Sequence, residues 1–493
     1  MRKIFFQLYY ITLCKELQFI FQFVILLIEK IFIWSAKMRE ILPKKLKILA
    51  KACPSPLYVV GGSVRDCLAG LTPSVADWDI CSPMPAETFS KIAQQNGFKV
   101  DAVYRNTGTV KISDGEQGYE YSSFRSDKYV RGTHVPVAIF FTEDITLDAR
   151  RRDFTANAVY YDIDKEIYVD PLQGIPAIKE KRLTTVDNAN KVFGEDGLRL
   201  MRLARQAAQL GFEPDEACLI GATNNAELIK DISPERIFEE LMAILTADQK
   251  CGIQDAPYHG LKILDETGVL GHILPELTLG KGLAQRSDYH RYDVLEHSLR
   301  AVKYMEREND DPVLRLAALL HDVGKPSCML RLGNAYGHPE EGEVLATQIL
   351  HRLKAPKKTL QRVCALVKYH MYDFNCQTSE PKLRRFFVEH YALLDDLLLI
   401  KQADFSACKD DLQKAPTRVK WEALLAQMHK EKVPFSLKEL AVNGMDILNE
   451  HIPAPHVATI LNALLLHLAC NPKDNEKGKL LRLAVGFHKS LFN

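Results

Sequence analysis

The sequence predicts an α+β protein, in which a mixed α/β domain near the N-terminal end is followed by helices. Between 57 and about 170, short β-branched runs such as LYVVGG and ANAVYYDI alternate with Gly, Asp and Pro, and residues 85–96 show helical spacing. From about 194 onward, apolar residues recur at helical spacing, and SPERIFEELMAIL has Ser and Pro where a helix begins. The chain of 493 residues is long enough for about three domains.

The overall charge predicts no general attraction to nucleic acid or membrane. The chain has 64 basic and 63 acidic residues and a net charge of +1, so any nucleic acid must bind through local patches. Its 11 cysteines show no CxxC spacing, which argues against a disulfide framework and against a zinc ribbon. This cysteine usage fits a reducing compartment, and we expect a cytoplasmic protein.

The first 37 residues are rich in aromatic and aliphatic side chains. The uncharged run between Glu16 and Glu29 is too short to cross the bilayer as a helix, and WSAKM is a poor signal-cleavage site. Three interpretations remain open: an interfacial membrane helix, a helix packed on the core, or an upstream start codon with Met38 as the true beginning. We expect no stable membrane insertion.

The stretch VVGGSVRDCLAGLTPSVADWDI combines two features of a phosphate and metal site. Gly61 and Gly62 allow the backbone to approach a ligand closely, and the following amides can face an anion. Asp77 and Asp79 project from the same face of a strand, where two carboxylates repel each other unless a cation lies between them. A βα turn followed by a solvated loop is the alternative. The combination favours a triphosphate held with Mg²⁺ ions.

Three more groups of residues are candidates for the same site. Glu120 alternates with two tyrosines, so it can point toward the Asp pair from a neighbouring strand, although an exposed strand Glu looks similar. Arg152 stands beside Asp153; arginine binds phosphate through paired hydrogen bonds, and an aspartate accepts from a ribose hydroxyl. A solvated charge run is the alternative for this pair.

A helix predicted over 195–205 carries polar residues at steps of three: Asp196, Arg199, Arg202 and Arg205. Adenine and cytosine share an edge on which an amine donor adjoins a ring-nitrogen acceptor. An Asp accepts from the amine while an Arg donates to the ring nitrogen. Such a pair accepts ATP and CTP and rejects UTP and GTP. An amphipathic helix with a solvated Arg-rich face is the alternative.

The ordered motifs GGSVRD, DWD, RRDFTANA, EDGLRLMRLAR and SPERIFEEL resemble those of the class II tRNA nucleotidyltransferases, the CCA-adding enzymes of the poly(A) polymerase superfamily. The resemblance implies an enzyme that adds CCA to tRNA 3′ ends from CTP and ATP without a nucleic-acid template, by two-metal nucleotidyl transfer. The residues implied to hold the catalytic Mg²⁺ ions are Asp77 and Asp79, and Glu120 falls where the family has a further catalytic carboxylate on a strand. The residues implied to contact the triphosphate, the ribose and the base are Gly62, Arg65, Arg152, Asp153, Asp196, Arg199, Arg202 and Arg205.

One motif departs from the family. Its flexible loop usually reads close to Gly-Arg-His-Pro, whereas this chain has RGTHVP at 131–136. The family links that loop to the switch from C to A addition. Partial CC- or A-adding activity therefore remains an alternative. Poly(A) polymerase activity is another, because those enzymes share the same head.

Imidazoles and carboxylates form a second constellation in helical sequence. This combination suits a divalent transition metal, although a lone helical His is usually a packed or surface residue. Five motifs, in this order, resemble those of the HD-domain phosphohydrolases: VLEHSL, LLHDVGKP, YGHPEEG, VKYH and KQAD. The residues implied to bind the metal are His297, His321, Asp322 and Asp404. Those implied to bind a second ion or the scissile phosphate are His338 and His370. A protein that is chiefly an HD phosphohydrolase is a further alternative.

These interpretations divide the chain into five parts with tRNA, ATP and CTP as partners. The parts are a hydrophobic extension (1–37), a nucleotidyltransferase head (38–185), a helical neck (186–284), an HD domain (285–408) and a helical tail (409–493).

Overall fold

The computed structural model describes residues 37–71, 77–130, 136–285 and 289–492. They form two compact units. One contains the described residues up to Ser233 together with Glu266–Val269, and the other contains the remainder. The predicted fold class is confirmed, because the described strands all lie in the first unit and the second is helical. The division into five parts stays a prediction, and the predicted neck at 186–284 crosses the boundary between the two units.

The strands of the first unit form a seven-stranded sheet and two small sheets. The strand bounds are β1 (Tyr58–Val60), β2 (Asp77–Ser82), β3 (Lys99–Tyr104), β4 (Thr109–Ser113), β5 (Gly118–Ser123), β6 (Arg125–Lys128), β7 (Ala138–Phe141), β8 (Tyr160–Asp162), β9 (Ile167–Val169), β10 (Arg182–Leu183) and β11 (Glu213–Pro214). The large sheet has the order β3-β4-β5-β2-β1-β8-β9. Strands β2 and β5 run parallel in its centre, whereas its other described pairs are antiparallel.

One detail differs from the sequence prediction. A short strand, β11, follows residue 194, where helices alone were expected, and pairs with β10. Each of these two strands has two residues, and periodicity detects such short elements poorly. The predicted strand run PVAIFF forms β7, which pairs with β6 in a separate two-stranded sheet.

The helices of the first unit cover the large sheet and continue beyond it. They are α2 (Lys44–Ala52), α3 (Gly62–Leu68), α4 (Ala86–Gln95), α5 (Ile145–Arg150), α6 (Gly174–Lys179), α7 (Ala189–Glu195), α8 (Leu198–Leu210) and α9 (Glu216–Asn225), with 3₁₀ turns η1 (Thr155–Asn157) and η2 (Ala226–Asp231).

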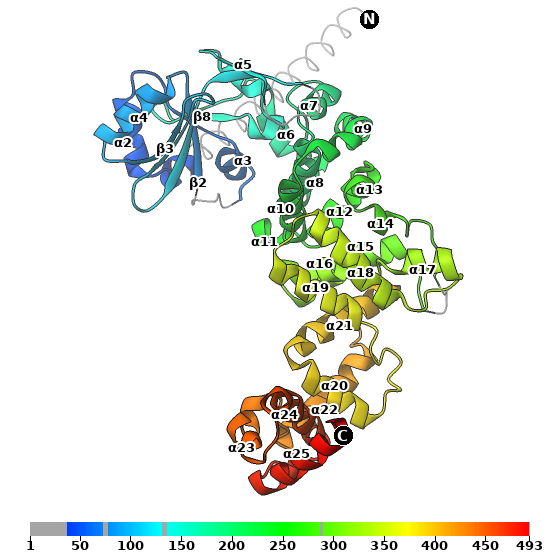
Figure 1. Cartoon of the computed structure of the whole chain (residues 1–493). Coiled ribbons are helices and arrows are strands. Elements are labelled where there is room, and N and C mark those ends of the chain that lie inside the picture. Colours follow the sequence, from blue (N-terminus) through cyan, green and yellow to red (C-terminus); the bar gives the residue numbers. More distant parts are fainter. Residues whose placement is uncertain (1–36, 72–76, 131–135, 286–288, 493) are drawn as a thin grey trace, which may run out of the picture. The chain divides into compact units, whose positions relative to one another are not determined.

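The two faces of the large sheet have different chemistry. Helix α4 packs on one face, where the ring of Phe89 stacks on Tyr121 with 3.7 Å between centroids. Tyr119 and Tyr121 of β5 are buried there, while Glu120 between them points to the opposite, exposed face. Figure 1 shows α4 on one side of the sheet and α3 on the other. One face therefore carries the core and the other is available for polar side chains.

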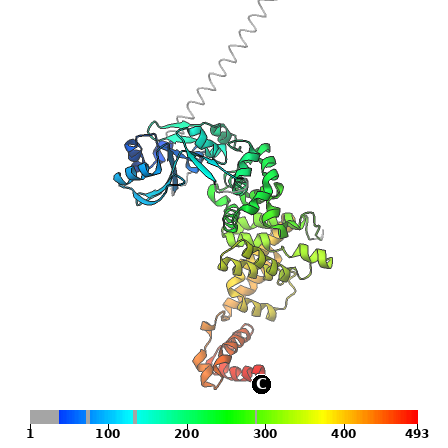
Figure 2. The same ribbon diagram turned by 45° about the horizontal axis from the view of Figure 1, so that its top comes forward.

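The second unit is built from helices in its described residues. They are α10 (Pro234–Leu245), α11 (Asp248–Cys251), α12 (Ala256–Glu266), α13 (Val269–Ile273), α14 (Pro275–Thr278), α15 (Val294–Glu308), α16 (Pro312–Leu320), α17 (Lys325–Leu332), α18 (His338–Arg352), α19 (Lys357–Tyr369), α20 (Glu380–Glu389), α21 (Leu394–Lys409), α22 (Pro416–Lys430), α23 (Gly444–Asn449), α24 (Ala454–Leu468) and α25 (Lys477–Phe492), with 3₁₀ turns η3 (Tyr391–Leu393), η4 (Leu437–Glu439) and η5 (Pro472–Asp474). Helix α10 begins at Pro234, as predicted. Figures 1 and 2 both show α23, α24 and α25 packed side by side at the C-terminal end.

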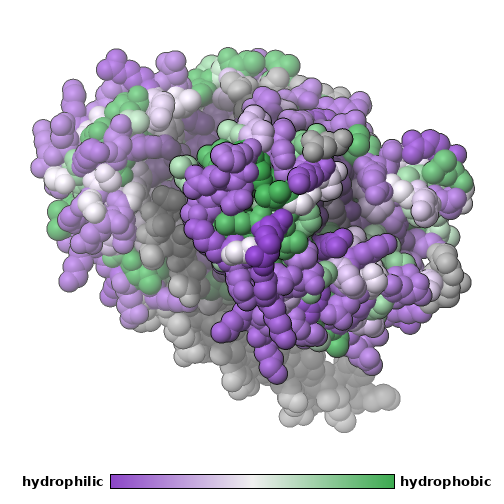
Figure 3. Space-filling model, turned by 60° about the horizontal axis from the view of Figure 1, so that its bottom comes forward, coloured by the Kyte–Doolittle hydropathy of each residue, from purple (hydrophilic) through white to green (hydrophobic). Residues whose placement is uncertain are grey.

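Among the described residues, no helix is both long enough and apolar enough to cross a membrane. Figure 3 shows one face of the molecule, on which hydrophilic residues predominate and hydrophobic ones form small patches. The ten described cysteines are all free thiols. Apart from Lys37 and Pro136, the N-terminal extension and the RGTHVP loop lie outside the described residues.

Candidate functional site

The glycine pair forms a tight turn against the Asp-x-Asp strand. Gly61 has φ of +82°, a left-handed conformation that side chains other than glycine rarely adopt. A Cβ at Gly61 would lie 3.0 Å from Oδ2 of Asp79. Helix α3 begins at Gly62, directly after this turn. The turn thus places the start of α3 next to the Asp79 carboxylate, as a joint phosphate and metal site requires.

The parallel pairing of β2 with β5 brings Glu120 beside Asp79. The two residues are directly paired across the strands, so their side chains lie on the same face of the sheet. Both are exposed, and Glu120 has an ion pair of 3.3 Å with Lys111 on β4. The backbone of Asp77 lies in β2, while its side chain is outside the described structure. Glu120 thus lies beside Asp79, as the resemblance implies for the third carboxylate.

Three of the predicted nucleotide-binding residues meet in one buried polar network. The Arg65 guanidinium donates to Asp66 (2.6 and 2.8 Å) and to Asn157 (2.7 Å). Asn157 in turn donates to Asp153 (2.8 Å), which also accepts two hydrogen bonds from Arg202 (2.6 and 2.8 Å). Burial raises the pKa of Asp153, but Arg202 and these hydrogen bonds outweigh burial and hold it well below its usual range. The network joins α3, η1 and α8 and holds Arg65 against protein groups.

A second buried carboxylate orients the arginines that precede Asp153. Asp148 accepts hydrogen bonds from Arg151 (2.7 Å), Arg152 (3.1 Å) and the Tyr160 hydroxyl (2.8 Å). Its side chain is completely buried. Burial raises the pKa of Asp148, but the two arginines and the hydroxyl outweigh burial and lower it from 3.8 to about 2. Asp148 is therefore a charged anchor for Arg151 and Arg152.

We expect the substitution Asp148→Asn to lower the free energy of unfolding of the head by about 2 kcal/mol at pH 7. A carboxyl whose pKa is lowered in the folded state contributes stability above its unfolded pKa near 3.8 and loses it as the pH falls toward 2. The difference between wild type and variant should therefore shrink below pH 4. Urea denaturation at several pH values measures it, with the exposed Asp164→Asn as control. Equal stability at pH 7 would contradict the assignment.

The predicted base-reading pair, Asp196 and Arg199, lies where two helices meet. Helix α7 ends at Glu195 and α8 begins at Leu198, so Asp196 lies between them and not inside the helix predicted over 195–205. Its side chain accepts a hydrogen bond from the backbone N–H of Leu198 (2.9 Å), the first residue of α8. Asp196 and Arg199 remain one turn apart, because the N–H of Arg199 bonds the carbonyl of Asp196 (3.1 Å).

Arg199 is held from three sides. Its guanidinium donates to the carbonyls of Val192 (2.9 Å) and Arg151 (2.7 Å) and to the Glu195 carboxylate (3.2 Å). These bonds use three of its five N–H donors. Within the described structure the other two have no hydrogen-bond partner, so the held guanidinium retains donors for a ligand. Arg205, further along α8, donates to Gln209 (3.1 Å).

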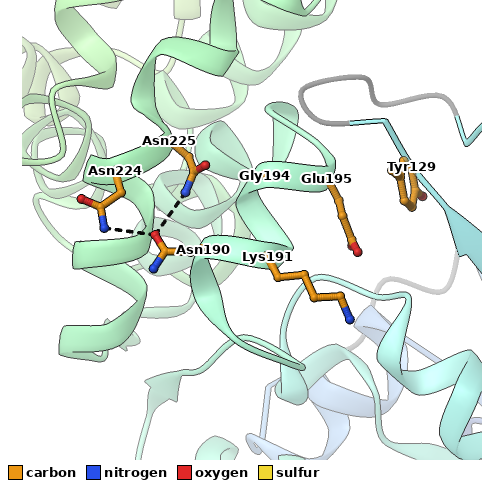
Figure 4. Close-up of a pocket in the computed structure, with 7 residues that line it drawn as sticks. All are labelled: Tyr129, Asn190, Lys191, Gly194, Glu195, Asn224 and Asn225. Carbon is orange, nitrogen blue, oxygen red and sulfur yellow. Dashed lines mark hydrogen bonds between the residues drawn. The ribbon is translucent and has the colours of Figure 1, made fainter.

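An open cavity of about 630 Å³ lies next to Arg199. Figure 4 shows Asn190, Asn224 and Asn225 gathered at one end, joined by hydrogen bonds of 3.1 and 3.4 Å, with Tyr129 at the other end. The cavity walls include Glu195 and Tyr129, and both contact Arg199: Glu195 by its ion pair and the Tyr129 ring by a cation–π contact at 5.7 Å. The cavity and the arginine thus form one polar region with an aromatic wall. Sequence reasoning missed this cavity, since its lining comes from three separate segments.

The predicted HD residues converge in the second unit around one carboxylate. Oδ2 of Asp322 lies 3.3 Å from Nε2 of both His297 and His321. Oδ1 lies 3.3 Å from Nε2 of His338 and 3.5 Å from Nε2 of His370. Asp404 completes the first group, with Oδ1 3.1 Å from Nε2 of His297. The six predicted residues therefore form two groups of donors that share Asp322.

A glycine makes this convergence possible. A Cβ at Gly324, two residues after Asp322, would lie 2.2 Å from the carbonyl oxygen of His338 and 2.6 Å from the N–H of Gly342. The chain after Asp322 therefore touches the first turn of α18, which no other residue at this position would allow without a shift. The sequence shows this signal as HDVGKP followed by HPEEG.

The electrostatics of the HD cluster favour a cation. Burial lowers the pKa of His321, but Asp322 and Asp404 outweigh burial and raise it to about 10. Burial lowers the pKa of His370 to about 4, so that imidazole is neutral. The Lys325 ammonium lies 2.6 Å from Asp322 Oδ2, so this carboxylate attracts positive charge from two directions. A divalent cation would displace the proton from His321, and carboxylates with neutral imidazoles form the donor set that binds divalent transition metals.

Comparison with known proteins matches three parts of the chain to family models. They are the poly A polymerase head domain (57–184), the probable RNA and SrmB-binding site of polymerase A (211–279) and the HD domain (294–400). Asp404 lies just beyond the last match. The candidate residues up to Asp153 fall within the head match, and the HD cluster falls in or directly after the HD match, whereas Asp196, Arg199, Arg202 and Arg205 lie between the first two matches.

Two curated relatives match over most of the chain. An A-adding tRNA nucleotidyltransferase of Deinococcus radiodurans is 31% identical over 83% of this chain and 91% of its own length. A multifunctional CCA protein of Tolumonas auensis is 28% identical over 71% of this chain and 84% of its own length.

Solved structures agree in fold. A Bacillus stearothermophilus CCA-adding enzyme in complex with CTP matches with a TM-score of 0.63 at 24% identity, over 91% of this chain and 98% of that one. A tRNA nucleotidyltransferase complexed with a primer tRNA and an incoming ATP analog matches with a TM-score of 0.52 at 21% identity, over 79% and 100%. The resemblance identified from the ordered motifs is confirmed, and the chain belongs to the tRNA nucleotidyltransferase family, with a poly(A) polymerase head and an HD domain.

Proposed function

We propose that this protein adds CCA to the 3′ end of tRNA from CTP and ATP without a nucleic-acid template. The observation that carries the proposal is the alignment of Asp79 with Glu120 on one sheet face, directly against the Gly61 turn. This arrangement supports a carboxylate site next to a backbone that can face a triphosphate.

The carboxylates Asp77, Asp79 and Glu120 would hold the Mg²⁺ ions in the head. The exposed oxygen donors of Asp79 and Glu120 fit that ion, which prefers carboxylates and phosphate oxygens. When bound, Mg²⁺ would neutralise charge on the triphosphate and on the attacking hydroxyl. The protein's own part is to fix the two strands in register and to keep Gly61 free of a side chain. The proposal includes two further sets of contacts. Gly62 and Arg65 would contact the triphosphate, and Arg152 and Asp153 would contact the phosphate and the ribose of the nucleotide.

Base choice would rest on Asp196 and Arg199. The pre-held guanidinium keeps donors for the ring nitrogen of cytosine or adenine, and the Asp196 carboxylate accepts from the exocyclic amine. The adjoining cavity supplies room for a base beside Tyr129, with Arg202 and Arg205 on the next turns of α8. Uracil and guanine would leave both polar groups unpaired, which costs about 1–3 kcal/mol for each group.

The test is incorporation of single labelled nucleotides into tRNA lacking CCA and into tRNA ending in CC. We expect two C residues from CTP on the first substrate, one A from ATP on the second, and negligible use of UTP and GTP. Arg199→Ala and Asp196→Asn should both lower the use of CTP and ATP and reduce discrimination against UTP and GTP.

Asp196→Asn is the milder of these variants, because the amide oxygen of asparagine can still accept from the backbone N–H of Leu198. Arg182→Ala, an exposed arginine of the same unit, is the matched control. An unchanged preference for CTP and ATP in both variants would show that the base is read elsewhere.

One observation favours a narrower function. The relative from Deinococcus radiodurans is named an A-adding enzyme, and the RGTHVP loop departs from the family pattern. If CTP is not incorporated into tRNA lacking CCA while ATP is added to tRNA ending in CC, the protein is an A-adding enzyme. If neither nucleotide is incorporated into either tRNA, the proposal is wrong.

We further propose a metal-dependent phosphohydrolase activity for the HD cluster. His297, His321, Asp322 and Asp404 would hold one divalent transition metal, with His338 and His370 at a second ion or at the phosphate. The two oxygens of Asp322 facing two groups of imidazoles support this assignment. A bound ion would activate water and polarise the phosphate.

A further inference from the structure

Two side chains outside the HD motif lie against its first group of donors. A donor atom of each of His290, His297 and Cys408 lies within 4.8 Å of the others. Cys408 follows Asp404 by one turn of α21, and its Sγ lies 4.0 Å from Oδ1 of Asp404. His290 precedes α15, and its ring meets that of His297 edge to face at 4.9 Å. Helices α15 and α21 therefore bring together two imidazoles and a thiol.

The imidazole of His297 is tied differently from the other three of the HD cluster. Those three each place Nδ1 against a backbone carbonyl: His321 with Ala318 (2.7 Å), His338 with Ala335 (2.8 Å) and His370 with Val367 (2.6 Å). Such a bond fixes a metal-binding imidazole with Nε2 toward the ion. Among the described residues, Nδ1 of the fully buried His297 has no hydrogen-bond partner, and neither has Nδ1 of His290.

Two buried ring nitrogens without partners need an explanation, because each costs about 1–3 kcal/mol when unpaired. Two imidazoles and one thiol form a soft donor set that suits Zn²⁺ or Co²⁺ and suits Mg²⁺ poorly. Three protein donors leave one place of a tetrahedral ion for water or another ligand. A cation held by one ring nitrogen of each histidine and by the thiolate would give this group of buried donors a common partner.

We propose that His290, His297 and Cys408 form an additional metal position beside the HD cluster, which binds a thiophilic divalent cation such as Zn²⁺. Binding forms a metal–sulfur bond and releases the thiol proton of Cys408 to solvent. When the HD metal is bound at Nε2 of His297 as well, that ring bridges the two ions as imidazolate, and its N–H proton is also released to solvent. His297 is the one residue that the additional position shares with the proposed HD metal site. The proposal depends on the proposed HD site only for that shared residue.

Cobalt substitution of the full-length protein tests the proposal. Protein stripped of metal with a chelator and titrated with Co²⁺ should develop the near-ultraviolet absorption of a thiolate–cobalt bond. Cys408→Ser should abolish that absorption. Cys364→Ser is the matched control and should retain it, because Cys364 is a buried cysteine of the same unit that contacts Thr347 and is not part of the proposed group of donors. After equilibration with Zn²⁺ and dialysis, His290→Ala and Cys408→Ser should each hold about one ion per chain fewer than wild type.

Co²⁺ binding to wild type without thiolate absorption, or absorption that persists in Cys408→Ser, would overturn the proposal. The absorption reports only the metal–sulfur bond, so it is independent of hydrolysis. Wild-type protein that shows the band but hydrolyses no phosphate ester would refute the hydrolase activity and support the additional position. Wild-type protein that hydrolyses phosphate esters but lacks the band would support the hydrolase activity and refute the additional metal position. Thermal unfolding of each variant checks that serine and alanine leave the fold intact.

Discussion

Replacing Asp79 by alanine is expected to lower nucleotide incorporation at least about a thousandfold. A metal ligand at the reacting phosphate stabilises the transition state by several kcal/mol, and each 1.4 kcal/mol corresponds to about a factor of ten. Asp79 is exposed on the open sheet face, so its removal leaves the core unchanged. Incorporation of labelled ATP and CTP into tRNA, with circular dichroism to check folding, measures the effect.

The matched control is Asp101→Asn, an exposed aspartate of β3 in the same sheet. It should incorporate nucleotides at the wild-type rate. Glu120→Gln keeps the size of the side chain and should reduce the rate less than Asp79→Ala, because glutamine still offers one oxygen donor. The same loss as for Asp79 is expected for Asp77→Ala. Near-normal incorporation by either alanine variant would refute the metal assignment.

The double substitution His321→Ala and Asp322→Ala is expected to abolish metal-dependent hydrolysis and to leave nucleotide addition largely intact. Asp322 faces both groups of imidazoles, so its removal takes a donor from each. The HD cluster and the carboxylates of the head lie in different compact units. Hydrolysis of 2′,3′-cyclic nucleotides and phosphomonoesters, assayed with a series of divalent metals, measures the first effect, and tRNA extension measures the second.

Asp322→Asn tests the same point with less disturbance of the buried cluster, because it preserves the shape of the side chain. His351→Ala, an exposed histidine of α18, is the control and should behave as wild type. Metal content should fall in the double variant and stay unchanged in the control. If wild-type protein hydrolyses none of these substrates with any metal tried, the hydrolase proposal fails.

The residue types of both candidate sites could be predicted from the sequence, because their signals are local. A glycine pair before an Asp-x-Asp strand defines a close turn and a shared strand face over one short stretch. The His-Asp step in LLHDVGKP likewise carries its chemistry in adjacent residues. The mixed α/β region and the helical remainder were also predictable, since strand and helix differ in the period of their apolar residues.

Pairing between distant segments was decided only by the tertiary structure. Glu120 reaches Asp79 because β2 and β5 run parallel in the middle of the sheet, and no spacing in the sequence specifies which strands become neighbours. For the same reason, a linear motif does not reveal that Arg65 is buried and donates to Asp66 and Asn157, because Asn157 lies 92 residues further along the chain.

Helix ends and helix packing were the other features that only the folded chain fixed. The sequence predicts one continuous helix through Asp196, yet this residue lies between two helices, where its side chain accepts from the backbone N–H of Leu198. Asp322 divides its two oxygens between histidines of four different segments, and His290 meets Cys408 only where α15 packs on α21. The sequence by itself thus determined which donors and acceptors this protein carries, whereas long-range packing determined which of them share a site.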